Sequence, residues 1–325
     1  MGGNIWKHQS RALDLAHYKQ VEATVLNDLA SYEIEHRAIP YLQNKQYFGD
    51  LDIVVNKEDM AKLGQYIDLA YDYSFKTKSV YSCLFGNHFQ VDFILVDSGS
   101  LDFACNYFSY NDLGLMLGKL AKNLHVTFGF QGLFYKHSSV SGSHLGVTML
   151  TQDYSEALSI LGLDPARFKE GFNSEVKMFE YVLSSPYVDT SRLQFDGMSN
   201  KDRVRDKKRL NYNRFLHHIN SLDIVRSFDK DSKTVFEYFP QLEEIHANLV
   251  SEHNHKEFVA KKFNGSLVHK YTGLEGKALG AFLKFMKRPS DRELGQLSES
   301  SIKQHILNNY ITYKAMYENL TTPIT

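Results

Sequence analysis

Hydrophobic side chains in the first hundred residues follow two different periods. Residues 18–32 and 57–71 repeat apolar side chains every three or four positions, which is the spacing of one face of a helix. Apolar runs at residues 53–55 and 89–96 are typical of buried strands. Another apolar segment and a Gly86-Asn87 pair precede the second run, and this pattern predicts a hairpin. Helix, strand, helix and hairpin in this order predict a small mixed sheet with flanking helices.

The pattern continues with a further helix and a pair of strands. Residues 111–124 carry leucines at helical spacing. Residues 128–136 and 145–150 are predicted to be strands on either side of a polar turn rich in serine and glycine. Another helix should follow, with Thr151 or Asp153 as its N-terminal cap.

A domain boundary is expected within residues 184–197, where helical periodicity lapses and turn-forming residues gather. The chain beyond it is predominantly helical in pattern. We therefore expect an α+β fold: residues 1–190 form a small mixed-sheet domain with an N-terminal helix, and residues 191–325 form a mainly helical domain.

Composition limits the class of protein. Of 325 residues, 43% are hydrophobic and 23% are charged, which is typical of a globular protein in water. No apolar run reaches the length of a membrane span, and the N-terminal residues lack a secretory hydrophobic region. Cys83 and Cys105 are too few for a disulfide framework and lack zinc-ligand spacing. We expect a cytoplasmic protein that does not enter a membrane.

Three aspartates are placed where strands should bring them together. Asp50 and Asp52 are two positions apart, so their side chains leave the same face of a strand. Asp92 lies inside an apolar strand, where an unpaired charge is costly. If the two strands are neighbours, the three carboxylates converge. The alternative is an ordinary Gly-Asp turn and an acid at a strand edge.

Converging carboxylates repel one another unless a cation neutralises them. Hard oxygen ligands favour Mg²⁺ or Mn²⁺ over Zn²⁺, and Mg²⁺ characteristically binds a few carboxylates together with substrate phosphates. The chemistry that fits this ligand set is phosphoryl transfer with two divalent ions.

At these positions the chain resembles the nucleotidyltransferase superfamily that includes DNA polymerase beta, poly(A) polymerases and tRNA CCA-adding enzymes. Residues 49–55, Gly-Asp-Leu-Asp-Ile-Val-Val, match its first acidic motif, and residues 91–94, Val-Asp-Phe-Ile, match its second. Residues 2–5, Gly-Gly-Asn-Ile, are similar to the start of nucleotidyltransferases from phages. The resemblance implies a palm-like catalytic domain in residues 1–190.

The resemblance also implies roles for the three acids. Asp50 and Asp52 would hold both ions, and Asp92 would complete the site of the ion that activates the attacking hydroxyl. The implied reaction moves a nucleoside monophosphate from an NTP, such as ATP, to a 3′-hydroxyl and releases pyrophosphate. If the protein is encoded by a phage, the expected location is the host cytoplasm.

One expected motif is missing. Family members place a Gly-Ser or Gly-Gly pair about ten residues before the acidic pair, whereas residues 37–48 contain no glycine and include Pro40, which has no N–H to donate. Triphosphate binding must therefore use other groups. Arg37 and Lys45 are the nearest cations, with Gly49 beside the first acid as the third candidate. Surface charge is the alternative role for both cations.

Cations also gather in the second half of the chain, although the net charge is only −1. If residues 201–209 form one helix, Lys201, Arg205 and Lys208 share a face with Arg209 beside them, as suits a phosphate backbone. A solvated helix with internal ion pairs is the alternative. Lys277 follows a Gly-rich helix entry similar to one in CCA-adding enzymes, which would favour RNA; close helix packing is the alternative there.

These patterns predict a metal-dependent nucleotidyltransferase whose acceptor is nucleic acid, with RNA of the tRNA kind preferred. Two other functions fit the same core. One is transfer of a nucleotide to a protein hydroxyl, as in nucleotidylating toxins. The other is nucleic-acid binding without turnover, which the missing Gly-Ser pair would explain.

Overall fold

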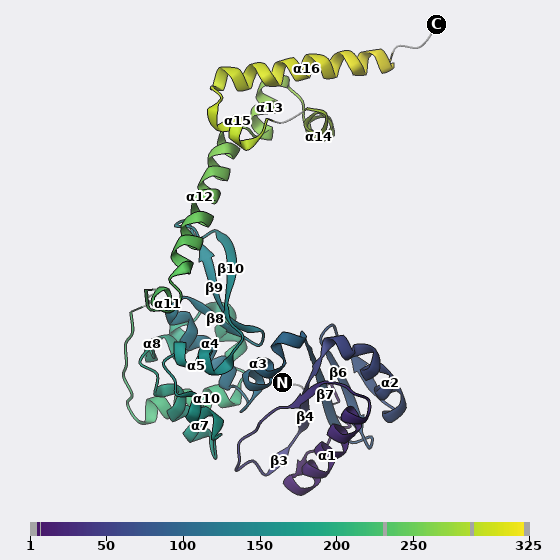
Figure 1. Ribbon diagram of the computed structural model, residues 1–325, viewed down its shortest axis with the longest axis vertical. Coiled ribbons are helices and arrows are strands. Elements are labelled where there is room, and N and C mark those ends of the chain that lie inside the picture. The colour runs from purple at the N-terminus through teal and green to yellow at the C-terminus, as the bar shows by residue number, and fades with distance from the viewer. Residues whose placement is uncertain (1–4, 7, 230–232, 287–288, 322–325) are drawn as a thin grey trace. The chain divides into compact units, whose positions relative to one another are not determined.

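The computed structural model describes residues 5–6, 8–229, 233–286 and 289–321 (Figure 1). Residues 2–4 of the Gly-Gly-Asn-Ile segment lie outside these ranges. The chain divides into two compact units, one of residues 1–136 and 147–241, the other of residues 137–146 and 242–325. Residues 191–241, which we expected to join the helical domain, belong to the first unit. The fold is mixed α+β, with a mixed sheet and a helical C-terminal region, as expected.

A five-stranded mixed sheet forms the centre of the N-terminal half. Its strand order is β2 (His36–Ala38), β4 (Asp50–Asn56), β7 (Phe89–Val96), β6 (Val80–Phe85) and β5 (Ser74–Lys76). The two central strands, β4 and β7, are parallel, whereas the other neighbours are antiparallel. The predicted hairpin is confirmed as β6 and β7, with Gly86 and Asn87 at positive φ in its loop.

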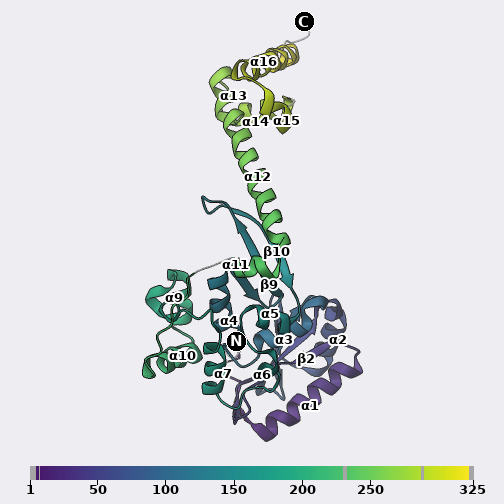
Figure 2. The same ribbon diagram turned by 60° about the vertical axis from the view of Figure 1, so that its left-hand side comes forward.

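Helices pack on both faces of this sheet. α1 (Leu15–Ser31) and α2 (Met60–Ala70) pack on the apolar residues of β4, β6 and β7 that face them. Both helices can be followed in Figure 2. On the opposite face, α3 (Leu101–Phe108) buries Val54 and Val96 near the ends of the two parallel strands. The beginnings of β4 and β7 on that face are left for polar side chains, because α3 reaches only the later residues.

The rest of the first unit is mainly helical and includes two smaller sheets, although residues 137–146, at the turn between β9 and β10, belong to the second unit. β1 (Leu13–Asp14) pairs with β3 (Tyr47–Phe48), and β8 (Val126–Gly129), β9 (Gly132–Ser138) and β10 (His144–Thr151) form a three-stranded sheet. The strand expected over residues 128–136 is therefore wrong in one respect, because a turn between two glycines divides it. The helices are α4 (Leu113–Ala121), α5 (Tyr154–Ile160), α6 (Pro165–Lys169), α7 (Glu175–Leu183), α8 (Thr190–Leu193), α9 (Asn200–Asp206), α10 (Leu210–Ser221) and α11 (Lys233–Tyr238). Short 3-10 turns are η1 (Lys57–Asp59), η2 (Ser98–Ser100), η3 (Lys122–Leu124) and η4 (Phe195–Gly197).

The second unit has a hydrophobic core of its own. Its helices are α12 (Gln241–Lys262), whose first residue belongs to the first unit, α13 (Gly265–Thr272), α14 (Gly276–Phe285), α15 (Asp291–Gln296) and α16 (Glu299–Thr321). The buried members of this core run from Val259 to Ile306 along the chain and include Phe282 at the centre. Within the described residues, none of the helices combines the length and the apolar character needed to cross a membrane.

Candidate metal centre

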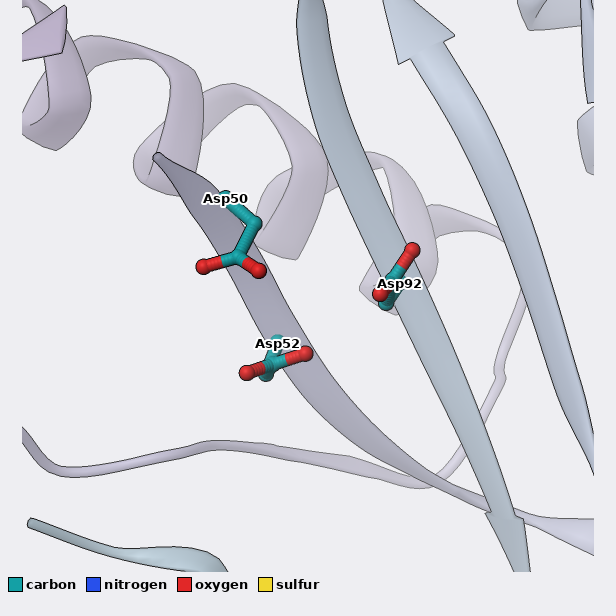
Figure 3. A group of neighbouring side chains, drawn as sticks. All are labelled: Asp50, Asp52 and Asp92. Carbon is teal, nitrogen blue, oxygen red and sulfur yellow. The ribbon is translucent and has the colours of Figure 1, made fainter. Parts of the chain in front are cut away.

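The register of the two parallel strands brings the three aspartates together. β4 and β7 pair so that Asp52 lies directly opposite Asp92, and Asp50 lies two residues before Asp52 on the same face. Figure 3 shows Asp50 and Asp52 on one strand and Asp92 on the next. Carboxylate oxygens of the three residues lie within 4.8 Å of one another. The expected convergence is confirmed.

Two neighbouring side chains fix the orientation of Asp92. Ser82, opposite Asp92 on β6, donates its hydroxyl to Oδ1 at 2.5 Å. Gln90, two residues earlier on β7, donates its amide to both carboxylate oxygens at 2.9 Å. Burial raises the pKa of Asp92, while these hydrogen bonds lower it. The bonds hold a carboxylate that is only 3% exposed in one position.

Among the three acids, Asp52 has a pKa that is raised by burial and by its two acidic neighbours. Burial raises its pKa to about 7, and the carboxylates of Asp50 and Asp92 act in the same direction. The ammonium group of Lys45 lowers it. A divalent cation would remove the repulsion, and three carboxylates are the hard oxygen donors that Mg²⁺ and Mn²⁺ prefer. The residues present therefore fit a divalent ion.

A first hollow opens beside Asp50 and Asp52. It has a volume of about 100 Å³, and its polar lining includes Lys45 and Asn111. The Lys45 ammonium lies 4.6 Å from the centre of the Phe48 ring, which is stacked on Tyr18. Burial lowers the pKa of Lys45, while Asp50 and Asp52 raise it. This hollow, which we call the Lys45 hollow, places a cation next to the acids.

A second hollow, of about 350 Å³, opens beside Asp52 and Asp92. Its described lining is mainly apolar and includes Phe108 and Phe130. We call it the Phe130 hollow. The two hollows share Asp52, Ile94 and Phe108, so the acidic cluster lies between them.

The other predicted nucleotide-binding residues are less well placed. The Arg37 guanidinium donates to Asp102 on α3 at 2.8 Å, and Arg37 lines neither hollow. Gly49 directly precedes β4, but a Cβ there would meet no atom within 4 Å, so no close approach requires glycine. Of the two cations, only Lys45 lines the hollow beside the acids.

The expected basic helix over residues 201–209 is wrong. α9 ends at Asp206, and Arg209 is the N-cap residue of α10. The Asp206 carboxylate is buried and accepts from Arg205 and from Lys119 on α4, while Arg209 pairs with Asp112. The helix breaks at this point because the Asp206 carboxylate packs in the interior. The cations therefore do not form one continuous face. Lys201 and Lys208 remain exposed, on two different segments, and so does Lys277 in the first turn of α14.

Several side chains at the site were not predicted from the sequence. Gln90 follows from strand alternation, because it precedes Asp92 by two positions. Ser82 follows from the register of the hairpin. Asn111 lines the Lys45 hollow from a pair of residues, Tyr110 and Asn111, with φ of 52° and 64°. Positive φ at two adjacent non-glycine residues is uncommon and strained.

The chain matches no protein-family model and no curated protein sequence.

Proposed function

We propose that this chain is a divalent-metal-dependent nucleotidyltransferase that moves a nucleoside monophosphate from an NTP to a 3′-hydroxyl of RNA, with release of pyrophosphate. The observation that supports it most is the pairing of Asp52 with Asp92 across β4 and β7, with Asp50 on the same face. Asp50, Asp52 and Asp92 would hold two Mg²⁺ or Mn²⁺ ions. Such ions supply charge neutralisation and lower the pKa of an attacking hydroxyl.

Other residues of the chain have separate roles in the proposed reaction. Lys45 is the cation beside the acids, and it offsets phosphate charge on the side of Asp50. Ser82 and Gln90 are positioning residues, because they hold the Asp92 carboxylate and contact no reacting group in the proposal. Lys45 in this way takes over the role that a Gly-Ser pair has in the superfamily. Exposed Lys201, Lys208 and Lys277 are the candidate contacts to an RNA backbone.

The test offers the purified chain Mn²⁺ or Mg²⁺, each labelled NTP in turn, and tRNA, single-stranded RNA, primed DNA or no added acceptor. We expect labelled RNA from the unmodified chain and none from Asp52→Asn or Asp92→Asn. The matched control is Asp68→Asn, which changes an exposed aspartate on α2 and should leave transfer intact. Label on the protein itself would establish the protein-nucleotidylating alternative, and no label under any combination would refute the proposal.

Lys45→Met tests the role of the cation separately from the acids. A charge-assisted hydrogen bond contributes about 1.5–3 kcal/mol, so we expect kcat/KM for the NTP to fall about 10- to 100-fold. Lys57→Met is the control, because Lys57 is exposed and pairs with Asp97 at 3.6 Å outside the Lys45 hollow. Unchanged kinetics in Lys45→Met would remove Lys45 from the site.

A further inference from the structure

The Phe130 hollow differs in charge from the Lys45 hollow. The charged groups among its described lining residues are the carboxylates of Asp52 and Asp92, and the rest of this lining is Thr77, Ser79 and apolar side chains. A polyphosphate placed there would meet two carboxylates without a cation from these residues. Lys45 lies in the other hollow. Charge therefore assigns the triphosphate to the Lys45 hollow and leaves the Phe130 hollow for a group without a strong negative charge.

Phe130 is an exposed aromatic residue that lines this hollow. It lies in the turn between β8 and β9 and is 38% exposed. Its ring stacks on Phe108, with ring centres 5.8 Å apart and planes 21° from parallel. At the end of this turn Gly132 has φ of +144°, and a Cβ there would lie 2.7 Å from the carbonyl oxygen of Thr151. The turn is thus closely fitted to β10, and it holds an aromatic ring in the lining of the hollow.

The size of the Phe130 hollow also limits its ligand. A volume of about 350 Å³ lies near the lower end for small-ligand pockets, which hold a group larger than one amino-acid side chain. The apolar walls suit a planar ring, and exposed aromatic side chains stack on nucleobases of any sequence. Ser79, which also lines the hollow, is an exposed residue, and its hydroxyl can bond a sugar or a base edge.

We infer that the Phe130 hollow binds the 3′-terminal nucleoside of the acceptor strand, with its base packed on Phe130 and its hydroxyl directed to Asp52 and Asp92. This inference rests on the proposed function, of which it names the acceptor subsite. Phe130 acts as a binding residue for the acceptor and has no role in holding the triphosphate.

The test measures binding without turnover. A short RNA carries the fluorescent base 2-aminopurine at its 3′ end, and it is titrated with the full-length chain in Mg²⁺ without NTP. Stacking on an aromatic ring quenches this base. We expect quenching with the unmodified chain and an increase in Kd of about 10-fold or more in Phe130→Ala, with quenching retained in Phe130→Trp. The same RNA with 2-aminopurine at its 5′ end in place of the 3′ end should show no quenching that depends on Phe130.

Phe75→Ala is the matched control, because Phe75 on β5 is 49% exposed and does not line the hollow. Equal Kd and equal quenching in Phe130→Ala and the unmodified chain would overturn the inference, as would the absence of quenching at the 3′ end. Quenching that depends on Phe130 in a chain that transfers no nucleotide would support this subsite while refuting the proposed reaction. Transfer to RNA with a Kd indifferent to Phe130 would do the reverse.

Discussion

At the residue scale, the acidic cluster and the buried carboxylate of Asp206 have their charge balanced in different ways. The acidic cluster of Asp50, Asp52 and Asp92 has Lys45 nearby, and Ser82 and Gln90 donate to the Asp92 carboxylate. Asp206, by contrast, is fully buried and bonded by both Arg205 and Lys119. The first arrangement leaves repulsion that a cation relieves, whereas the second is complete in the protein itself.

We therefore expect divalent ions to stabilise the unmodified chain. Mg²⁺ or Mn²⁺ at about 100 times its Kd should add about 2.7 kcal/mol to the free energy of unfolding, seen as a higher Tm. Asp52→Asn should raise the Tm in EDTA, because it removes a carboxylate whose pKa burial and Asp50 push to about 7, and it should abolish most of the ion response. A Tm that does not respond to millimolar ions in the unmodified chain, or responds equally in Asp52→Asn, would contradict the metal centre. Asp68→Asn is again the control.

The buried ion pair makes a separate prediction. Asp206→Asn leaves Lys119 without its carboxylate, so the free energy of unfolding at neutral pH should fall by about 3–5 kcal/mol in a denaturant titration. Glu180→Gln, which breaks the exposed Lys177–Glu180 pair, should cost less than about 1 kcal/mol. Equal losses in the two variants would show that burial of the pair does not matter.

The buried pair of Asp206 and Lys119 also predicts how the free energy of unfolding depends on pH. Burial acts to raise the pKa of Asp206, but bonds from Arg205 and Lys119 outweigh it and hold the pKa below 3.8. A lowered carboxyl pKa stabilises the fold fully above the ordinary value and loses that contribution as the pH falls through the lowered value. The stability difference between the unmodified chain and Asp206→Asn should therefore shrink below about pH 4.

At the element scale, the two glycines of α4 differ in how closely a neighbouring backbone approaches them. A Cβ at Gly114 would collide with the carbonyl oxygen of Tyr107, at the end of α3, whereas a Cβ at Gly118 would lie 3.6 Å from the carbonyl oxygen of Phe128. Gly114 thus permits the contact between α3 and α4, and Gly118 does not limit any contact.

This difference predicts opposite effects of the same substitution on one helix. Gly114→Ala should lower the free energy of unfolding by about 1–3 kcal/mol, because the backbone must move. Gly118→Ala should leave it unchanged or raise it by up to about 1 kcal/mol, because alanine favours the helix interior. Thermal unfolding of the two variants checks the sign, and destabilisation by Gly118→Ala equal to that by Gly114→Ala would contradict the assignment.

Elements and site differ in how far the sequence predicts them. The helices around Val25 and Leu63 and the strands of the acids were predicted, because their periods are local properties. The break after Asp206 was not, since it depends on Lys119, more than eighty positions earlier, donating to the buried Asp206 carboxylate. The three acids were found from strand alternation, but Phe130 was not, because a single exposed aromatic in a turn has no periodic signal.

At the scale of the whole molecule, each compact unit has its own core. Phe282 is fully buried in the second unit, against the rings of Tyr310 and Tyr313. Phe103 is buried in the first unit, against Phe128 and Tyr154. The buried residues of the core around Phe282 all belong to the second unit.

Because each unit has its own core, shortening a buried side chain should destabilise only the unit that contains it. Phe282→Ala should destabilise the second unit by about 3–5 kcal/mol and leave the melting of the first unit unchanged. Phe103→Ala should do the opposite. Differential scanning calorimetry, with hydrogen exchange to assign each transition, distinguishes the two. A single transition that both variants shift equally would show that the units unfold together.

The parallel pairing of β4 with β7 has a consequence for folding. Asp52 and Asp92 are about forty positions apart in the chain, so their meeting is a long-range event that must wait for loop closure. A slip of one residue between these strands would turn Asp92 toward the face covered by α1 and α2. Ions in the surrounding solution would then stabilise only the correctly registered sheet, so the acidic cluster would select against misfolded chains before any substrate arrives.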